Sequence, residues 1–312
     1  MSSRLASILF TALPLTLAAC NSASTTGSET AGAGGSGGSG TGGVTETTST
    51  TKDRTTPDPM FLPAVTGACP DFTEGTITVS PDGKSRDLRL WISDAAASLD
   101  GPIVFFWHGV GGSPNDALYA LGTPVIDEIK ALGGMVIAPV HDPDAGTFPW
   151  YLTTGGTNDS DIRVMDEALA CAIQKVGVDL RHIHSTGFSA GAMNTTQVGW
   201  WRSGYIASVV TFSGAQIGTP PDQDPENKFP AMVVHGGAAT SSSSSSAPER
   251  EVRPSLKDEG HFAFICDHGK GHTVPTDIRQ PAWQFLQDHP FGQQPEPYAE
   301  ALPAGFPSYC SL

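Results

Sequence analysis

Residues 187–191 read Gly187-Phe188-Ser189-Ala190-Gly191, and this stretch, together with its neighbours, decides the fold class. The preceding residues 181–186 form a short, partly β-branched segment, as expected of a strand. The following residues 192–198 contain no Gly or Pro and can begin a helix. A serine placed in this way is typical of the strained turn that raises a nucleophilic hydroxyl above a parallel sheet. The stretch therefore predicts that Ser189 is a nucleophile.

Continuous apolar runs lie on both sides of this turn, and strands that are buried on both faces of a parallel sheet have this pattern. They cover residues 103–107, 135–140, 206–212, 231–234 and 262–265. Helical segments lie between them, the clearest running from Asp161 to Val176 with its apolar side chains on one stripe. We therefore expect an α/β fold with a mostly parallel sheet, helices on both faces, and ligands beyond the carboxyl ends of the strands.

An antiparallel hairpin is expected at the start of this domain. Residues 76–80 and 87–92 alternate between polar and apolar side chains, and Pro81-Asp82-Gly83-Lys84 lies between them as a turn. Counted from residue 60 to residue 312, about 250 residues are available, which suits a single catalytic domain with a substantial core.

The N-terminus has the features of a lipoprotein signal peptide over residues 1–19. Arg4 supplies a positive charge, residues 5–17 are apolar, and Leu17-Ala18-Ala19-Cys20 resembles the lipobox of bacterial lipoproteins. The apolar run is too short to span a bilayer, and a buried core helix is the alternative. We expect cleavage before Cys20, lipid attachment to its sulfur, and export to the cell envelope, at the outer membrane or the cell surface.

Residues 20–59 contain Cys20 and a linker rich in Gly, Ser and Thr, with almost no large apolar side chain. Such a composition cannot bury enough surface to fold, so we expect a flexible, disordered tether. The whole chain of 312 residues carries a net charge of −15 and no cluster of Lys or Arg. A nucleic-acid partner is therefore not expected, and the protein is predicted to be a monomer anchored to a membrane through its lipid.

The cysteine content indicates disulfide bonds. Without the lipidated Cys20, an even number of cysteines remains in an exported chain, namely Cys69, Cys171, Cys266 and Cys310. They allow two disulfides in three connectivities, and four reduced thiols are the alternative. Cys310 lies in a Pro-rich tail that needs to be tied down, so we predict that it is bridged.

A glycine-rich loop follows the first buried strand and reads His108-Gly109-Val110-Gly111-Gly112-Ser113-Pro114-Asn115-Asp116. Glycine lets the backbone approach a ligand, and backbone N–H groups there can stabilise an oxyanion. We expect the N–H groups of Val110 and Ala190 to form the oxyanion hole, a plain turn being the alternative. His108 precedes the serine in the chain, so a structural hydrogen-bonding role is favoured over that of the base.

The general base is expected after the last parallel strand, where residues 262–275 contain two histidines. His272 is favoured because it lies in a polar segment flanked by glycine that can reach the turn, whereas His268 abuts the strand end. His235 ends an earlier strand and is expected to be structural.

The acid that would orient the histidine is not evident. It is expected after Val234, but the loop there contains no carboxylate before Glu249. Glu249, Glu251 and Asp267 are the candidates, and the alternative is a neutral acceptor at a large cost in rate.

Trp150 is the best candidate for holding an apolar acyl or aryl group, with packing in a long loop as the alternative. Trp200 and Trp201 are expected in the core or an interface. The segment His141-Asp142-Pro143-Asp144 lacks matching ligand residues elsewhere, so no metal is expected.

These motifs together resemble the polyhydroxybutyrate depolymerase and feruloyl-esterase-like branch of the α/β-hydrolases. The likeness covers roughly residues 66–290 and rests on the loop from His108 to Asp116, on GFSAGAM around Ser189, and on GHTVP around His272. It implies the α/β-hydrolase fold, Ser189 as nucleophile, His272 as base, and extracellular ester cleavage. The family typically has HGxxD where this chain has HGGAA, so that Ala239 or Thr240 stands where the acid is expected.

We therefore expect a secreted serine ester hydrolase that acts through an acyl-enzyme on Ser189 and needs no cofactor. Polyesters, short-chain esters and aryl esters of the feruloyl type are the candidate substrates. The alternative is a non-catalytic binding protein of the same fold that lacks a complete triad, and peptidase activity is a third possibility.

Overall fold

The computed structural model describes residues 59, 61–151, 158–215, 227–237 and 255–312. Its strands are β1 (Gly75–Val79), β2 (Arg86–Trp91), β3 (Gly101–Trp107), β4 (Met135–Pro139), β5 (Val178–Phe188), β6 (Ser208–Phe212), β7 (Ala231–His235), β8 (Ala263–Asp267) and β9 (Cys310–Ser311). Residues 1–58 lie outside the described residues, and with them the expected signal peptide, the lipidation site at Cys20 and nearly all of the linker.

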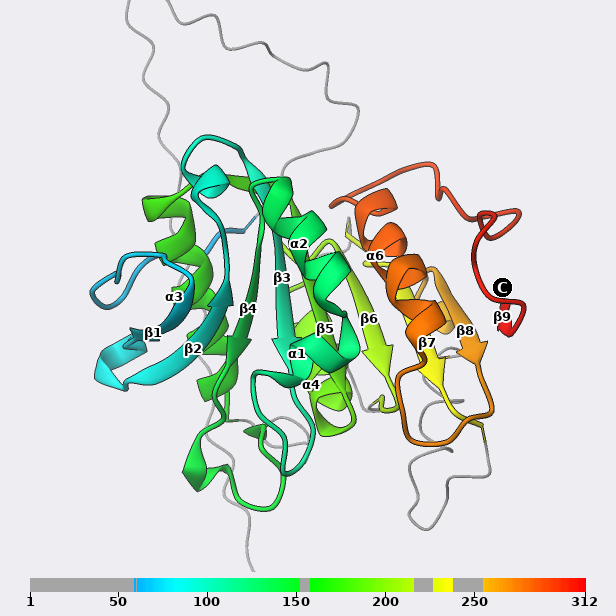
Figure 1. Cartoon of the computed structure of the whole chain (residues 1–312), viewed down its shortest axis with the longest axis horizontal. Helices are drawn as coiled ribbons and strands as arrows, with labels where there is room; N and C mark the ends of the chain where they lie inside the picture. The colour runs from blue at the N-terminus through cyan, green and yellow to red at the C-terminus, as the bar shows by residue number, and fades with distance from the viewer. Residues whose placement is uncertain (1–58, 60, 152–157, 216–226, 238–254) are drawn as a thin grey trace, which may run out of the picture. The chain divides into compact units, whose positions relative to one another are not determined.

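The described strands form one sheet in the order β1-β2-β4-β3-β5-β6-β7-β8-β9 (Figure 1). The neighbouring strands from β4 through β3 and β5 to β8 pair in parallel, whereas β1 with β2, β2 with β4, and β8 with β9 pair antiparallel. The predicted parallel sheet and the predicted N-terminal hairpin are therefore confirmed. The parallel strands end at the same edge of the sheet, so the loops that follow them meet there.

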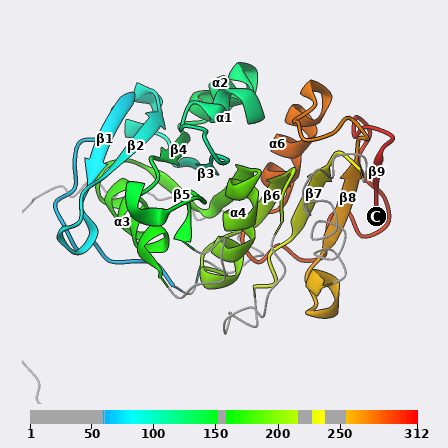
Figure 2. The same cartoon turned by 90° about the horizontal axis from the view of Figure 1, so that it is seen from below.

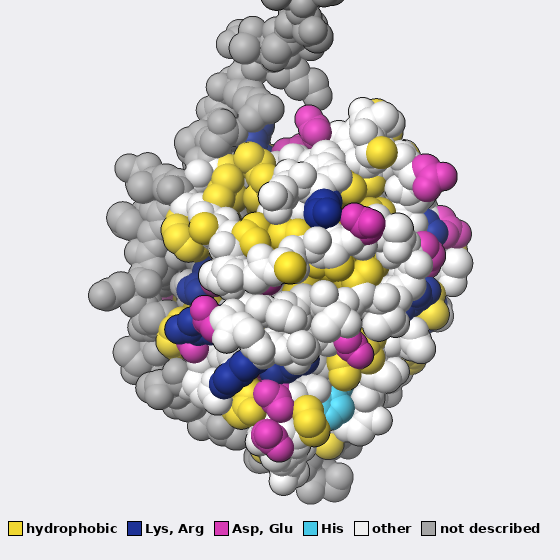
Figure 3. Space-filling view, turned by 90° about the vertical axis from the view of Figure 1, so that its left-hand side faces the viewer, with side chains coloured by type: hydrophobic (Ala, Val, Ile, Leu, Met, Phe, Trp, Pro, Cys, Tyr) yellow, Lys and Arg dark blue, Asp and Glu magenta, His cyan; other side chains and the backbone are white. Residues whose placement is uncertain are grey.

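The burial of the strands distinguishes the centre of the sheet from its edge. Every residue of β3 and β4 is buried, as expected of strands covered on both faces. In β1, buried residues alternate with exposed ones, as expected at the edge of a sheet. Figure 3 shows acidic and basic side chains interspersed on the face at this edge, and one pair joins Arg89 to Glu74 at 3.0 Å. Charges of this kind discourage pairing with a second sheet.

The described helices include α1 (Asp116–Ala120), α2 (Thr123–Ala131), α3 (Ser160–Lys175), α4 (Ala190–Trp201) and α6 (Arg279–Asp288). Figure 2 shows α1, α2 and α6 on one side of the sheet and α3 and α4 on the other. The predicted stripe of α3 is confirmed, since Ile162, Met165 and Leu169 are fully buried. Burying each such side chain contributes about 1.5–3 kcal/mol. No helix in these described stretches has the length and apolar character to cross a bilayer.

Two disulfides tie the ends of the domain to its core. Cys69 bonds to Cys171 in α3, and Cys266 in β8 bonds to Cys310 in β9. The prediction of two disulfides, with Cys310 bridged, is confirmed. The tail after α6 is thereby attached to the last parallel strand.

A buried carboxylate holds the segment before β1. Glu167 on α3 accepts the N–H groups of Thr66 and Gly67 at 2.8 and 2.7 Å. Sequence periodicity did not indicate this contact, because Glu167 lies off the apolar stripe of Ile162, Met165 and Leu169.

Candidate active site

Ser189 lies at a strained turn between β5 and α4. Its backbone has φ 58° and ψ −121°, which a non-glycine residue rarely adopts. A Cβ atom at Gly187 would lie 2.3 Å from the carbonyl oxygen of Gly191, and one at Gly191 would lie 1.9 Å from that of Trp107. Both glycines are therefore required by close main-chain packing. The strand, tight turn and helix expected around Ser189 are present.

His272 faces this serine from the loop after β8. Its Nε2 lies 3.0 Å from Oγ of Ser189, which is hydrogen-bonding distance. Burial lowers the pKa of His272 from its ordinary value of 6.5, so the ring is neutral at pH 7 and able to accept a proton. The geometry thus brings together the two residues predicted as nucleophile and base.

The other two candidate histidines are engaged elsewhere. Nδ1 of His268 accepts the N–H of Lys270 at 3.1 Å, and burial lowers the pKa of this buried ring. Nδ1 of His235 accepts the N–H of Gly237 at 3.1 Å. Both side chains are buried, and these hydrogen bonds lie within the loops after β7 and β8, in agreement with structural roles.

The loop after β3 lies directly against the serine. A Cβ atom at Gly109 would lie 2.9 Å from the Cβ of Ser189. The carbonyl oxygen of Gly109 accepts hydrogen bonds from Nδ1 of His108 at 2.8 Å and from the N–H of Gly112 at 3.1 Å. The carbonyl of Gly109 and the N–H of Val110 belong to one trans peptide and point in opposite directions. The two hydrogen bonds to the carbonyl therefore also fix the direction of the Val110 N–H.

Ala190 is the first residue of α4, and the N–H groups in the first turn of a helix have no partner within the helix. Its N–H is therefore available beside Ser189. The assignment of Val110 and Ala190 as oxyanion donors remains a prediction.

His141 supports His108, a role that the sequence did not indicate, since His141 was considered there only as part of a possible metal site. Because Nδ1 of His108 donates to a carbonyl, its Nε2 must accept, and Nδ1 of His141 lies 3.2 Å from it. Burial also lowers the pKa of His108, which favours this neutral form. The position of His141 directly after β4, at the edge where ligands are expected, was the available signal.

The orienting acid is not among the described residues that contact His272. Glu249 and Glu251 lie outside the described residues, as do Ala239 and Thr240 at the family position. Oδ1 of Asp267 lies 3.7 Å from Nδ1 of His235 and accepts the N–H of Gly269 at 3.3 Å.

Burial removes the main reason for giving Trp150 a substrate-binding role. The side chain is 0% exposed, its Nε1 donates to the carbonyl oxygen of His108 at 2.8 Å, and its ring packs against Trp107. This corresponds to the packing role that the sequence left as the alternative. Trp200 is likewise part of the core, as expected.

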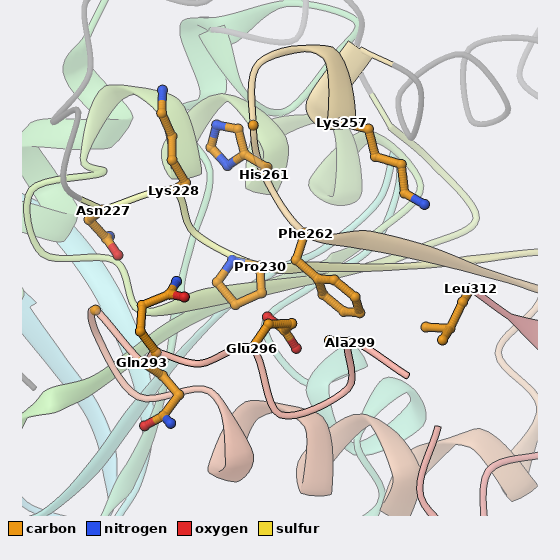
Figure 4. Close-up of a pocket in the computed structure, with 13 residues that line it drawn as sticks. Asn227, Lys228, Pro230, Lys257, His261, Phe262, Gln293, Glu296, Ala299 and Leu312 are labelled. Atoms are coloured by element: carbon orange, nitrogen blue, oxygen red, sulfur yellow. The ribbon is translucent and has the colours of Figure 1, made fainter. Parts of the chain in front are cut away.

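A cavity of about 480 Å³ lies at the opposite edge of the sheet (Figure 4). Its lining includes Lys228 and Pro230, which precede β7, and His261 and Phe262, which precede β8. Nδ1 of His261 faces the carbonyl oxygen of Phe229 at 2.8 Å, and burial lowers its pKa to about 4. Because these are the amino ends of the strands, the cavity is separate from the edge that carries Ser189.

Comparison with known proteins supports the fold. No model of a protein family matches the chain. Feruloyl esterase D of Neurospora crassa is 27% identical over 178 residues, which are 50% of this chain and 58% of that protein. The chain thus spans less than two thirds of this relative.

Two solved structures are similar in fold. A thermostable esterase has a TM-score of 0.54 and 18% identity, covering 69% of this chain and 62% of its own. The native structure of pOPH has a TM-score of 0.53 and 18% identity, covering 72% of this chain and 91% of its own. Together with the strand order and the turn at Ser189, these similarities show that the chain has the α/β-hydrolase fold.

Proposed function

We propose that this protein is a serine carboxylic ester hydrolase. The observation that carries the proposal is the 3.0 Å contact between Oγ of Ser189 and Nε2 of His272, with the serine held at a strained turn. A neutral histidine beside a serine hydroxyl is the arrangement that activates such a nucleophile.

In the proposed mechanism, Oγ of Ser189 attacks the ester carbonyl while Nε2 of His272 takes the hydroxyl proton. The N–H groups of Val110 and Ala190 stabilise the negative charge on the carbonyl oxygen. His272 then donates the proton to the departing alcohol, which leaves an acyl group on Ser189. Water, activated by the same histidine, releases the acid and restores the enzyme.

Aryl and polymeric esters are the proposed substrates. The similarity to feruloyl esterase D supports cinnamoyl-type esters, and the polyester-cleaving relatives that the sequence resembles support polymers. The side chain of Val110, next to the proposed oxyanion donor, is 54% exposed and offers an apolar contact at the mouth of the site. Rates on methyl ferulate, p-nitrophenyl butyrate and a polyhydroxybutyrate film would rank these classes.

The direct test is hydrolysis of p-nitrophenyl butyrate by the wild type and two variants. We expect Ser189→Ala and His272→Ala each to reduce kcat by at least about 10³-fold. Ser98→Ala is a matched control, because among the described residues its hydroxyl bonds within a 3-10 turn, to the carbonyl oxygen of Ala95. Full activity of Ser189→Ala would refute the mechanism.

A non-catalytic binding protein is the second candidate, and it is favoured by the lack of a carboxylate partner for His272 among the described residues. A fluorophosphonate probe separates the two functions, because it labels an activated serine and reacts poorly with one that lacks a working base. Labelling that is lost in Ser189→Ala supports the enzyme, and no labelling of the wild type supports the binding protein.

We further propose that the protein is exported and lipid-anchored through Cys20, on the strength of its N-terminal sequence. In a bacterial host, an alkyne fatty acid is expected to label the wild type and not Cys20→Ala. Equal labelling of both would refute the anchor.

A further inference from the structure

The hydroxyl of Tyr119 is bonded to the residues that follow His272. Tyr119 lies on α1, and its hydroxyl accepts the N–H of Val274 at 2.8 Å. The same oxygen lies 2.6 Å from Oγ1 of Thr273. The N–H of Val274 can only donate, so the tyrosine oxygen is the acceptor there, whereas either hydroxyl can be the donor in the contact with Thr273. Two hydrogen bonds thus connect α1 to the loop of residues 268–275, here called the His272 loop.

The ring of Tyr119 contacts the other half of the site. It packs edge-on against Phe188, with ring centroids 5.6 Å apart. Phe188 directly precedes Ser189, and its ring lies 4.9 Å from that of His272. One side chain therefore contacts both the strand end that carries the nucleophile and the loop that carries the base.

Two further hydrogen bonds hold the main chain of the His272 loop at other points. Oγ of Ser213 donates to the carbonyl oxygen of Thr273 at 3.0 Å, and the N–H of Gly271 donates to the carbonyl oxygen of Gly236 at 3.2 Å. These bonds come from the loops after β6 and β7, whereas Tyr119 holds the loop from α1. The loop is thus tied to three neighbouring elements.

The backbone of Tyr119 is itself held in place by the first residue of α6. Its carbonyl oxygen accepts a hydrogen bond from Nη2 of Arg279 at 2.6 Å, at the start of α6. The side chain is 40% exposed and so contributes little to core packing. Its two hydrogen bonds to the His272 loop are therefore its main contribution.

The contacts of His272 show why such support matters. Within the described residues, its Nε2 bonds to Ser189 and no carboxylate contributes to the shift of its pKa. Hydrogen bonds to Gly271, Thr273 and Val274, on both sides of His272, fix where its ring lies relative to Ser189.

We propose that Tyr119 is a positioning residue that holds the His272 loop so that Nε2 stays within reach of the Ser189 hydroxyl. The inference rests on the proposed function, because it assigns a role in the same reaction. In this role Tyr119 acts through His272.

Tyr119→Phe tests this role, since it removes the hydroxyl and keeps the ring on Phe188. We expect kcat for p-nitrophenyl butyrate to fall about tenfold, as for the loss of one or two hydrogen bonds, with KM changed by less than about twofold. Tyr298→Phe is the matched control, because it removes a tyrosine hydroxyl that bonds to Asp288 at the end of α6, away from the His272 loop, and should leave kcat unchanged.

The same substitution in a His272→Ala background separates positioning from general stability. If Tyr119 acts through His272, Tyr119→Phe has no further effect on the residual rate of that variant. A tenfold fall in both backgrounds, or a lower melting temperature with unchanged kcat, would overturn the inference. If instead Ser189→Ala and His272→Ala keep full activity, the proposed function itself fails, so the two failures are distinct.

Discussion

Replacing Gly191 with alanine tests whether close main-chain packing holds the turn at Ser189. The added Cβ atom would lie 1.9 Å from the carbonyl oxygen of Trp107 and 2.7 Å from that of His108. Both residues are fully buried, so their backbone cannot move into open space. The turn and β3 would have to separate.

The magnitude follows from two opposing terms. Overpacking a well-filled core costs about 1–3 kcal/mol, and an overlap with buried backbone belongs at or above the upper end. Alanine favours a helix over glycine by up to about 1 kcal/mol. We therefore expect Gly191→Ala to lower the free energy of unfolding by about 2 kcal/mol or more.

Gly199→Ala on the same helix is the matched control. Its Cβ atom would lie 2.9 Å from Cζ of Phe229, so the overlap is smaller than at Gly191 and falls on a side chain rather than on the backbone. The gain in helix propensity then offsets most of the crowding, and a change within about 1 kcal/mol is expected. Urea unfolding followed by circular dichroism measures both variants. Equal losses for the two, or a Gly191→Ala variant as stable as the wild type, would refute the packing argument.

Three further predictions concern pH, covalent bonding and the oxyanion loop. Because burial lowers the pKa of His272 below 6.5, the base is neutral at higher pH, and kcat/KM should fall only as the pH drops below 6.5. A pH profile of kcat/KM measures this, and a fall centred above about pH 7 would contradict it. Replacing Cys69 and Cys171 by serine opens a loop with a sequence separation of 102 residues, and the free energy of unfolding should fall by up to about 4.7 kcal/mol. Urea unfolding measures this loss, and a value below about 1 kcal/mol would contradict a stabilising role of the disulfide. His141→Ala removes the hydrogen bond to His108 and should lower kcat about tenfold with little change in KM; unchanged kcat would show that the pair does not orient the loop.

Local patterns explain which parts of the fold could be predicted. The buried runs and the hairpin were recognisable because side-chain alternation and continuous burial are properties of a few consecutive residues. The turn at Ser189 was recognisable because the serine and its two glycines fall within five consecutive residues, between a strand-like and a helix-like segment. Strand ends differed by up to three residues, as when β6 began at Ser208 rather than at Ile206 and β5 at Val178 rather than at Arg181.

Other features depend on contacts between distant segments. Trp150 lies in a long loop, and nothing in its neighbours indicates that its ring turns into the core against Trp107. The bond from Glu167 to the segment before β1 spans about a hundred positions, and an acid off the apolar stripe of a helix is ordinarily expected to face solvent. Tyr119 gave no signal either, because its partners are 154 and 155 residues away.

The sequence by itself determined the class of fold, the serine at the turn and the choice of His272, because each depends on local pattern and on position relative to a strand end. Only the tertiary structure decided which groups meet: the 3.0 Å contact of Ser189 with His272, the pairing of the cysteines, and the support from Tyr119 and His141. The physical reason is that hydrogen bonds and disulfides act over a few ångströms, whereas the residues they join lie tens to more than a hundred positions apart and are brought together by the packing of the sheet.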